Sequence, residues 1–95
     1  MDLDNCRERI DELDDMLLDL LNQRAHLSLE VVKIKQAQGL PIYIPERETA
    51  VLNRLRDMNT GPLSGHAVQR LFRQIIDESR RLQQERRDGA ERRNA

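Results

Sequence analysis

The chain has 95 residues and a formal net charge of -1, so it forms one small domain without the basic excess typical of nucleic-acid binding. No apolar run approaches the roughly 20 residues that span a bilayer, and the acidic segment 1–4 is unlike a signal peptide, so we expect no membrane partner. The single cysteine, Cys6, excludes an intrachain disulfide and fits a reducing cytoplasm, which is the expected location.

An all-α fold is indicated by the composition and by the spacing of the apolar residues. Tyr43 and Phe72 are the only aromatic residues, so Leu, Ile and Val must build the core. The first helix is predicted over about 4–38, where neither Gly nor Pro interrupts the sequence. Its apolar residues recur in alternating steps of four and three, which is the spacing of a helical seam packed against another helix. This seam comprises Cys6, Ile10, Leu13, Leu17, Leu20, Leu27, Val31 and Ile34.

The predicted first helix is about 50 Å long at 1.5 Å per residue, and Gly39 followed by Pro41 ends it. The remaining residues, about sixty, cannot cover a helix of this length if they fold as a compact monomer. The seam therefore predicts a second copy of the chain, and we expect a homodimer.

Two further helices are predicted after the first. A short apolar loop over 39–44 leads to Pro45, which favours the first position of the second helix. The segment 59–62, Asn-Thr-Gly-Pro, ends that helix, and Ser64 is the expected N-cap of the third helix. The sequence therefore predicts three helices, of which the first is the longest.

The end of the chain differs in composition from the rest. Residues 85–95 are polar and rich in Arg, and they are apolar only at Ala90 and Ala95. This pattern indicates a frayed, solvated end or the start of a linker. We therefore expect a helical domain over 1–84 and a polar tail over 85–95.

Arg24 interrupts the seam at a position where the spacing requires an apolar residue. Burying a cation costs several kcal/mol unless a partner compensates it, so Arg24 indicates either a bound anion or a polar contact that fixes helix register. Lys35 follows about three turns later, within about 20° around the helix and about 16 Å along it. Two long cationic side chains on one face can bracket a small anion, although a lysine near a helix C-terminus also complements the helix dipole.

Four more polar residues are candidate ligand-binding residues on the second and third helices. Ser79 and Gln83 lie one turn apart and continue an apolar stripe of the third helix. Arg47 and Glu48 lie in the first turn of the second helix, where they would equally serve as surface charges. All four belong to the candidate site only if the helices bring them to one place.

Arg7 provides a geometric test of this site. It lies about 25 Å along the helix and about 100° around it from Arg24. It cannot share a small ligand with Arg24 of its own chain, but in an antiparallel or crossed dimer it can reach the partner's site. The alternative for Arg7 is a solvated pair with Asp11, one turn away.

Together these residues predict an apolar pocket between helices that is lined by cations, one carboxylate and one amide. Such a pocket suits a compact anion that carries two carboxylates and a hydroxyl. The sequence has no Ser-His-Asp arrangement and no Gly-rich phosphate loop, and His26 and His66 make a poor metal pair. An enzyme built from this set would rely on electrostatic preorganisation and on holding its substrate in a reactive shape.

Five segments resemble the all-helical class of chorismate mutases, in the order and spacing of that family. They are Cys-Arg-Glu-Arg-Ile-Asp-Glu-Leu-Asp (6–14), Leu-Leu-Asn-Gln-Arg-Ala (20–25), Val-Lys-Ile-Lys (32–35), Pro-Glu-Arg-Glu (45–48) and Leu-Phe-Arg-Gln-Ile-Ile-Asp-Glu-Ser (71–79). The stretch 45–48 followed by Asn-Thr-Gly-Pro-Leu is most similar to mutase domains fused to prephenate dehydratase or to the first shikimate-pathway synthase. The resemblance therefore implies a place in phenylalanine and tyrosine biosynthesis.

The resemblance implies an intertwined homodimer of three-helix chains with two sites, each of which uses residues of both chains. Arg24 and the partner's Arg7 would clamp the two carboxylates of chorismate. Lys35 and Gln83 would donate hydrogen bonds to the ether oxygen, where negative charge develops as the carbon–oxygen bond breaks. Glu48 would hold the ring hydroxyl.

The implied reaction is the pericyclic Claisen rearrangement of chorismate to prephenate, which needs no covalent catalysis, metal or cofactor. Arg47 and Ser79 would line the site near a carboxylate. One position departs from the family pattern, because the best-known free-standing members carry an aspartate just before Pro45, where this chain has Ile44. We expect Ile44 to weaken the hold on the substrate modestly and to leave the second helix less firmly capped.

Two alternatives stay open. An isochorismate-pyruvate lyase of the same fold resembles the chain around 45–47, but that branch typically lacks the glutamate that Glu48 provides. A non-catalytic helical dimer would use Arg24 only to set register, and Arg24→Leu would then stabilise it by completing the apolar seam.

Overall fold

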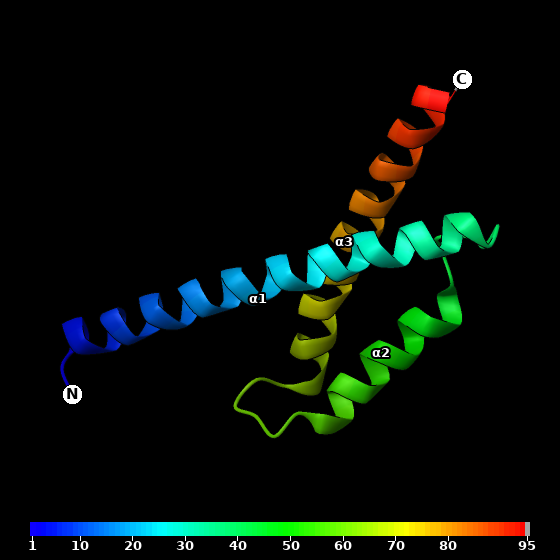
Figure 1. Ribbon diagram of the computed structural model, residues 1–95. Helices are drawn as coiled ribbons and strands as arrows, with labels where there is room; N and C mark the ends of the chain where they lie inside the picture. Colours follow the sequence, from blue (N-terminus) through cyan, green and yellow to red (C-terminus); the bar gives the residue numbers. More distant parts are fainter. Residues whose placement is uncertain (95) are drawn as a thin grey trace.

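The computed structural model describes residues 1–94 and contains three helices joined by two short loops (Figure 1). The helices are α1 (Leu3–Ala37), α2 (Pro45–Met58) and α3 (Gly65–Asn94). No strand occurs in this part of the chain. The predicted all-α class and the long first helix are confirmed.

The ends of α1 are fixed by local hydrogen bonds. At the start, the Asp2 side chain accepts from the backbone N–H of Asn5 at 2.8 Å. At the end, Gly39 has a φ of 68°, which a glycine adopts without a Cβ penalty. The N–H of Leu40 donates to the carbonyl of Lys35 at 2.8 Å, the bonding pattern with which a glycine commonly closes a helix. The chain therefore turns sharply just after Lys35.

The first turn of α2 lacks a side-chain cap. Ile44 occupies the N-cap position in an extended conformation, and Pro45 follows at the first helical position. The backbone N–H groups of Arg47 and Glu48 donate to the Ile44 carbonyl at 3.1 and 3.3 Å. The predicted start of α2 is confirmed. An aspartate at the N-cap would accept from one first-turn backbone N–H, which the Ile44 side chain cannot do.

The N-cap of α3 is Ser64, as predicted, since its hydroxyl accepts from the backbone N–H of Ala67 at 3.0 Å. The prediction of a frayed end from residue 85 is wrong for residues 85–94, because α3 continues through Asn94. Arg, Gln and Glu are good helix formers, and a turn-to-turn bond from Gln84 to Asp88 at 2.9 Å supports the segment. The last residue of the predicted tail, Ala95, lies outside the described residues.

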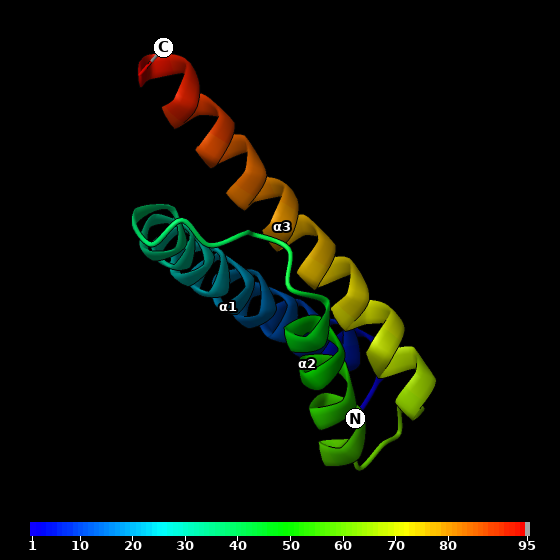
Figure 2. The ribbon, with the colours of Figure 1, turned by 90° about the vertical axis from the view of Figure 1, so that its right-hand side faces the viewer.

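Helix α3 packs against both other helices. It crosses α1 and runs beside α2, whereas the N-terminal half of α1 projects away from the rest (Figures 1 and 2). The buried apolar residues lie where the three helices and the first loop meet, and they are Val32, Ile42, Val51 and Ile76. The core is therefore small and sits at one end of α1.

The shape is elongated, with extents of 59 × 27 × 15 Å. The radius of gyration is 16.9 Å, compared with about 12 Å for a compact domain of this length. Much of the seam of α1 is solvent-exposed in the single chain, including Ile10, Leu13, Leu17, Leu20, Leu27, Val31 and Ile34. None of the three helices, over the described residues, combines the length and apolar content needed to cross a membrane.

Candidate active site

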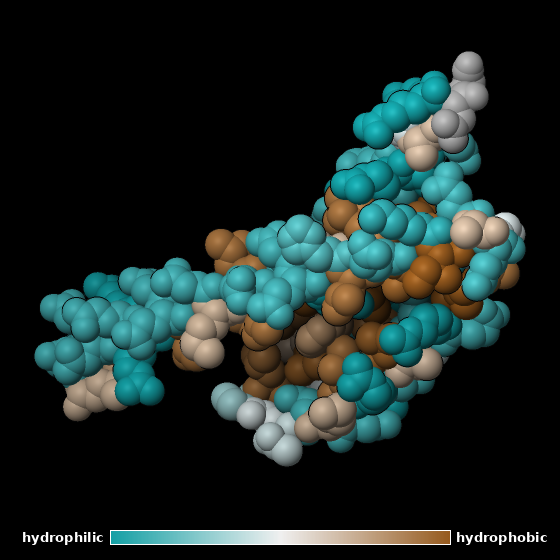
Figure 3. All heavy atoms as spheres, in the orientation of Figure 1, coloured by the Kyte–Doolittle hydropathy of each residue, from teal (hydrophilic) through white to brown (hydrophobic). Residues whose placement is uncertain are grey.

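A cavity of about 280 Å³ lies between the three helices and the first loop. Apolar side chains of each helix form part of its wall, and hydrophobic surface gathers in the recess between α1 and α2 (Figure 3). Seven of the eight predicted site residues line the cavity: Arg24, Lys35, Ile44, Arg47, Glu48, Ser79 and Gln83. Residues from three separate helices thus meet in one concave site of the size that suits a small ligand.

Arg24 reaches the cavity from the crossing of α1 and α3. Its Nη1 donates to the hydroxyl of Ser79 at 2.5 Å. Desolvation by burial, and secondarily the nearby charge of Arg47, lower the pKa of Arg24. The guanidinium therefore faces a neutral oxygen and another cation, so an anion in the cavity would stabilise it.

Gln83 lies one turn beyond Ser79 and makes the second polar contact of the helix crossing. Its Nε2 donates to the backbone carbonyl of Ser28 at 2.8 Å, and the residue is only 9% exposed. The Ser28 hydroxyl in turn donates to the carbonyl of Arg24 at 3.1 Å. Gln83 is therefore a buried amide with a fixed orientation, even though it lies only one residue before the end of the predicted domain at 84.

Lys35 projects into the cavity from the last turn of α1. Its Nζ donates to the backbone carbonyl of Ile42 at 3.0 Å. Desolvation by burial lowers its pKa, the charge of Arg87 lowers it further, and the Glu48 carboxylate opposes both. Because the turn at Gly39 folds the loop back over Lys35, the loop carbonyl is brought to the ammonium. Like Arg24, Lys35 donates to a neutral oxygen.

Glu48 provides the carboxylate of the cavity, and two guanidinium groups of α3 contact it. Arg73 Nη1 donates to Glu48 Oε1 at 2.7 Å, and Arg80 Nη1 donates to Oε2 at 3.0 Å and to Oε1 at 3.2 Å. Arg80 also lines the cavity. The hydrogen bond with Glu48 is the main reason that the pKa of Arg73 is raised.

Sequence reasoning did not find this contact between α2 and α3. Neither Arg73 nor Arg80 was among the predicted site residues. The available signal was the spacing of Arg73, Asp77 and Arg80, which places all three on one face of a helix. That signal identifies a charged face of the third helix, but it does not identify Glu48 as the residue that contacts this face.

Two predicted site residues place no polar side chain in the cavity of the single chain. Arg7 does not line the cavity, which agrees with the distance that separates it from Arg24 within one chain. Ile44 lines the cavity beside Glu48 but offers it only apolar surface. The site of a single chain therefore holds an anion-binding set without Arg7.

The arrangement can bind and polarise a small anion. Arg24, Lys35 and Arg47 supply positive charge, Gln83 supplies an amide donor, and Glu48 supplies an acceptor. Within residues 1–94, no three His, Cys, Asp or Glu side chains are grouped to hold a metal ion. Preorganised donors in a partly buried site stabilise developing negative charge more strongly than water does.

The fold and the cavity together define a small all-helical domain with a cation-lined cavity between its helices. The profile of the family described as chorismate mutase type II matches residues 6–84. The chain therefore belongs to this family, and the resemblance seen in the sequence is confirmed.

Relatives and solved structures agree with this assignment. The chain is 40% identical over 83 residues to a bifunctional chorismate mutase/prephenate dehydratase of Stutzerimonas stutzeri, covering 82% of this chain but only 23% of the relative. It is 32% identical to the chorismate mutase of Methanocaldococcus jannaschii, covering 87% of this chain and 85% of that protein. The chorismate mutase of Helicobacter pylori in complex with prephenate superposes with a TM-score of 0.80 and 36% identity, covering 87% and 90% of the two chains.

Proposed function

We propose that this chain converts chorismate to prephenate. The observation that carries the proposal is the single cavity in which Arg24, Lys35, Gln83 and Glu48 meet. The H. pylori relative whose structure contains prephenate supports the choice of substrate. Glu48 favours this reaction over pyruvate elimination from isochorismate, because the lyases of this fold typically lack that carboxylate.

In the proposed mechanism, the side chains hold chorismate in the shape in which its ends react. Arg24 binds one carboxylate, and Lys35 and Gln83 donate hydrogen bonds to the ether oxygen. The ether carbon–oxygen bond breaks as a carbon–carbon bond forms within the same molecule, so no proton or electron is exchanged with the protein. Negative charge on the ether oxygen is largest in the transition state, where the two donors stabilise it most.

The remaining residues complete the binding of the substrate. Glu48 accepts a hydrogen bond from the ring hydroxyl, and Arg47 and Ser79 line the end of the cavity that receives a carboxylate. Ser79 also holds the Arg24 guanidinium at 2.5 Å. These roles follow the family resemblance and agree with where each side chain lies.

We propose that two chains form an intertwined homodimer and that the partner's Arg7 completes each site. The single chain exposes 7573 Å², compared with about 5,700 Å² for a compact monomer of this mass. The excess exceeds the roughly 800 Å² that each partner buries in an interface of standard size. Most of the exposed large apolar side chains belong to α1, so the partner is expected to cover that helix.

The expected setting of the activity follows from the same comparisons. We infer that residues 1–84 form the catalytic domain and that 85–95 are a tail or a connection to a further domain, since the chain spans about a quarter of the length of the S. stutzeri relative. We also infer a cytoplasmic location, supported by the single free Cys6.

The test is incubation of the purified chain with chorismate, with the product identified by mass and NMR. We expect prephenate, and we expect the Arg24→Ala variant to lose the activity while it keeps its helical content. Product from isochorismate but not from chorismate would instead identify the lyase. A folded dimer inactive on both substrates would overturn the proposed function.

A further inference from the structure

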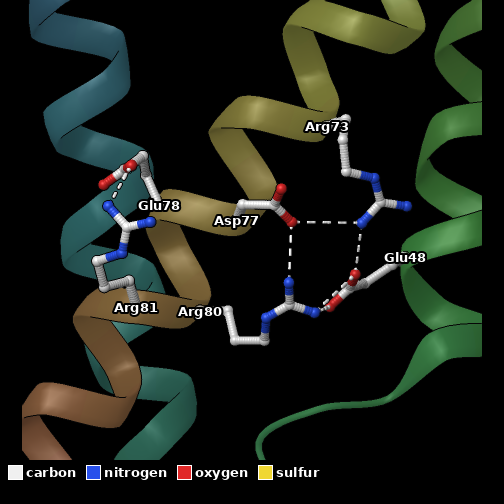
Figure 4. Close-up of polar contacts among 6 residues, drawn as sticks. All are labelled: Glu48, Arg73, Asp77, Glu78, Arg80 and Arg81. Carbon is white, nitrogen blue, oxygen red and sulfur yellow. Dashed lines mark hydrogen bonds and ion pairs between the residues drawn. The ribbon is translucent and has the colours of Figure 1, made fainter.

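Glu48 is held from the side of α3 by a closed set of ionic contacts (Figure 4). Arg73 and Arg80 lie two turns apart on α3 and both reach the Glu48 carboxylate. Asp77 lies between them, with its Oδ1 2.9 Å from Arg80 and 3.5 Å from Arg73. The Glu48 side chain is only 12% exposed, whereas the side chains of Arg73 and Arg80 are 38% and 34% exposed.

These contacts balance one another in charge. Two guanidinium groups and two carboxylates sum to zero, so Arg80 adds no free positive charge to the cavity even though it lines the wall. Asp77 Oδ1 accepts from both guanidinium groups and so helps to keep them beside Glu48. Arg80 is therefore placed to act on Glu48 rather than on an anionic substrate.

The start of α2 makes Glu48 depend on this support. Glu48 belongs to the first turn of a helix whose N-cap, Ile44, makes no side-chain hydrogen bond. Arg80 also lies over the ring of Tyr43, 4.7 Å from its centroid, in the loop immediately before Ile44. Arg80 thus contacts both the first turn of α2 and the loop that leads into it.

The contacts also leave one definite atom available to a ligand. A carboxylate has about four acceptor positions, two on each oxygen. Glu48 Oε1 accepts from Arg73 and Arg80, whereas Oε2 accepts only from Arg80. The vacant acceptor position is therefore on Oε2, and an incoming hydroxyl finds its partner there.

We propose that Arg73 and Arg80 are positioning residues that hold Glu48 so that its Oε2 accepts the ring hydroxyl of the substrate. This inference rests on the proposed function. In this proposal α3 orients the Glu48 carboxylate, because the uncapped start of α2 fixes it only weakly. The proposal also accounts for a grip on the hydroxyl in a chain that has Ile44 in place of an acidic residue.

The decisive experiment is a double-mutant cycle between Arg80→Met and Glu48→Gln, read as KM and kcat for chorismate. Arg81→Met is the matched control, because Arg81 is the next residue, is 66% exposed and pairs with Glu78 away from Glu48 (Figure 4). We expect Arg80→Met to lower kcat/KM about tenfold, the effect of one lost charge-assisted hydrogen bond. Most of the change should be in KM, because the hydroxyl is bound alike in the ground state and the transition state.

The cycle separates positioning from direct contact. If Arg80 acts through Glu48, Arg80→Met has no further effect in the Glu48→Gln background. Arg80→Lys keeps the charge, so it should recover part of the lost kcat/KM. Arg73→Gln removes the other guanidinium that contacts Glu48, so it should also raise KM. These two variants keep the test valid if Arg80→Met folds poorly.

Two results would overturn the inference while leaving the proposed function intact. One is an Arg80→Met variant that behaves like Arg81→Met. The other is an effect of Arg80→Met that persists undiminished in the Glu48→Gln background, which would mean that Arg80 contacts the substrate itself. An inactive wild-type dimer would overturn the proposed function, and this inference with it.

Discussion

Replacing Ile44 by aspartate tests two consequences of one structural feature, the uncapped start of α2. The residue already has the extended backbone of an N-cap, with φ -126° and ψ 94°, so an aspartate needs no backbone change to accept from the first-turn N–H groups. Its carboxylate would also lie in the cavity wall, next to Glu48. We therefore expect effects on both stability and substrate binding.

The expected stability change is the difference between two terms. An aspartate cap is worth about 1 kcal/mol relative to alanine. Ile44 is half-buried, so removing its side chain costs about 1 kcal/mol of apolar burial. The aspartate variant should thus match the wild type in unfolding free energy and exceed Ile44→Ala by about 1 kcal/mol, which urea unfolding at fixed protein concentration resolves.

The expected kinetic change is a better hold on the ring hydroxyl. A second carboxylate acceptor should lower KM for chorismate about three- to tenfold, within the range of one hydrogen bond to a charged group, and leave kcat unchanged. Ile44→Asn separates the terms, because it caps the helix without the negative charge. Equal stabilities of the aspartate and alanine variants would refute the capping argument, and an unchanged KM and kcat would refute the binding argument.

Three other substitutions test the cavity. Arg24→Leu should reduce kcat/KM by at least a hundredfold while unfolding free energy is preserved or raised, because it removes a desolvated cation from the seam; a clear loss of stability would contradict this. Gln83→Leu should lower kcat about a hundredfold with little change in KM, since in the proposed mechanism its amide stabilises negative charge that develops in the transition state. An effect confined to KM would contradict this role. Burial lowers the pKa of Lys35 in the folded chain below 10.5, its ordinary value in the unfolded chain. Between the folded-state pKa and 10.5 the unfolded chain therefore binds more protons than the folded chain, so the free energy of unfolding rises with pH across that window. Urea unfolding should therefore show the stability advantage of Lys35→Met over wild type shrinking between pH 8 and pH 10.5, and an advantage that grows would be inconsistent with the stated shift.

The helices were predictable because each has a local signal. Gly39 ends α1 with the bonding pattern typical of a glycine, and Ser64 caps α3 through its own hydroxyl. The end of α3 was mispredicted for the opposite reason. Its low apolar content suggested fraying, but Arg87 Nη2 donates to the carbonyl of Leu40 at 3.2 Å, which ties the segment to a loop distant in sequence.

The site was predictable where a residue violated the pattern of its own helix. Arg24 on an apolar seam and Gln83 on an apolar stripe are visible in the sequence, and both face the cavity. The partners of Glu48 were not visible, because Arg73 and Arg80 conform to an ordinary charged helix face. Which charges meet across two helices depends on the packing of α2 on α3, and the sequence alone does not encode that pairing in any local pattern.

The proposed sharing of each site between two chains gives the last prediction. Arg7 lies on the projecting half of α1, outside the cavity of its own chain, so the Arg7→Ala and Arg24→Ala homodimers should each be nearly inactive. In a mixed dimer, one site receives Arg24 from the first variant and the partner's Arg7 from the second, while the other site receives neither. Because half of randomly reassorted dimers are mixed, unfolding and refolding an equimolar mixture should restore about one quarter of wild-type activity. Refolding each variant alone is the control, and a mixture no more active than its components would show that Arg7 serves its own chain or none.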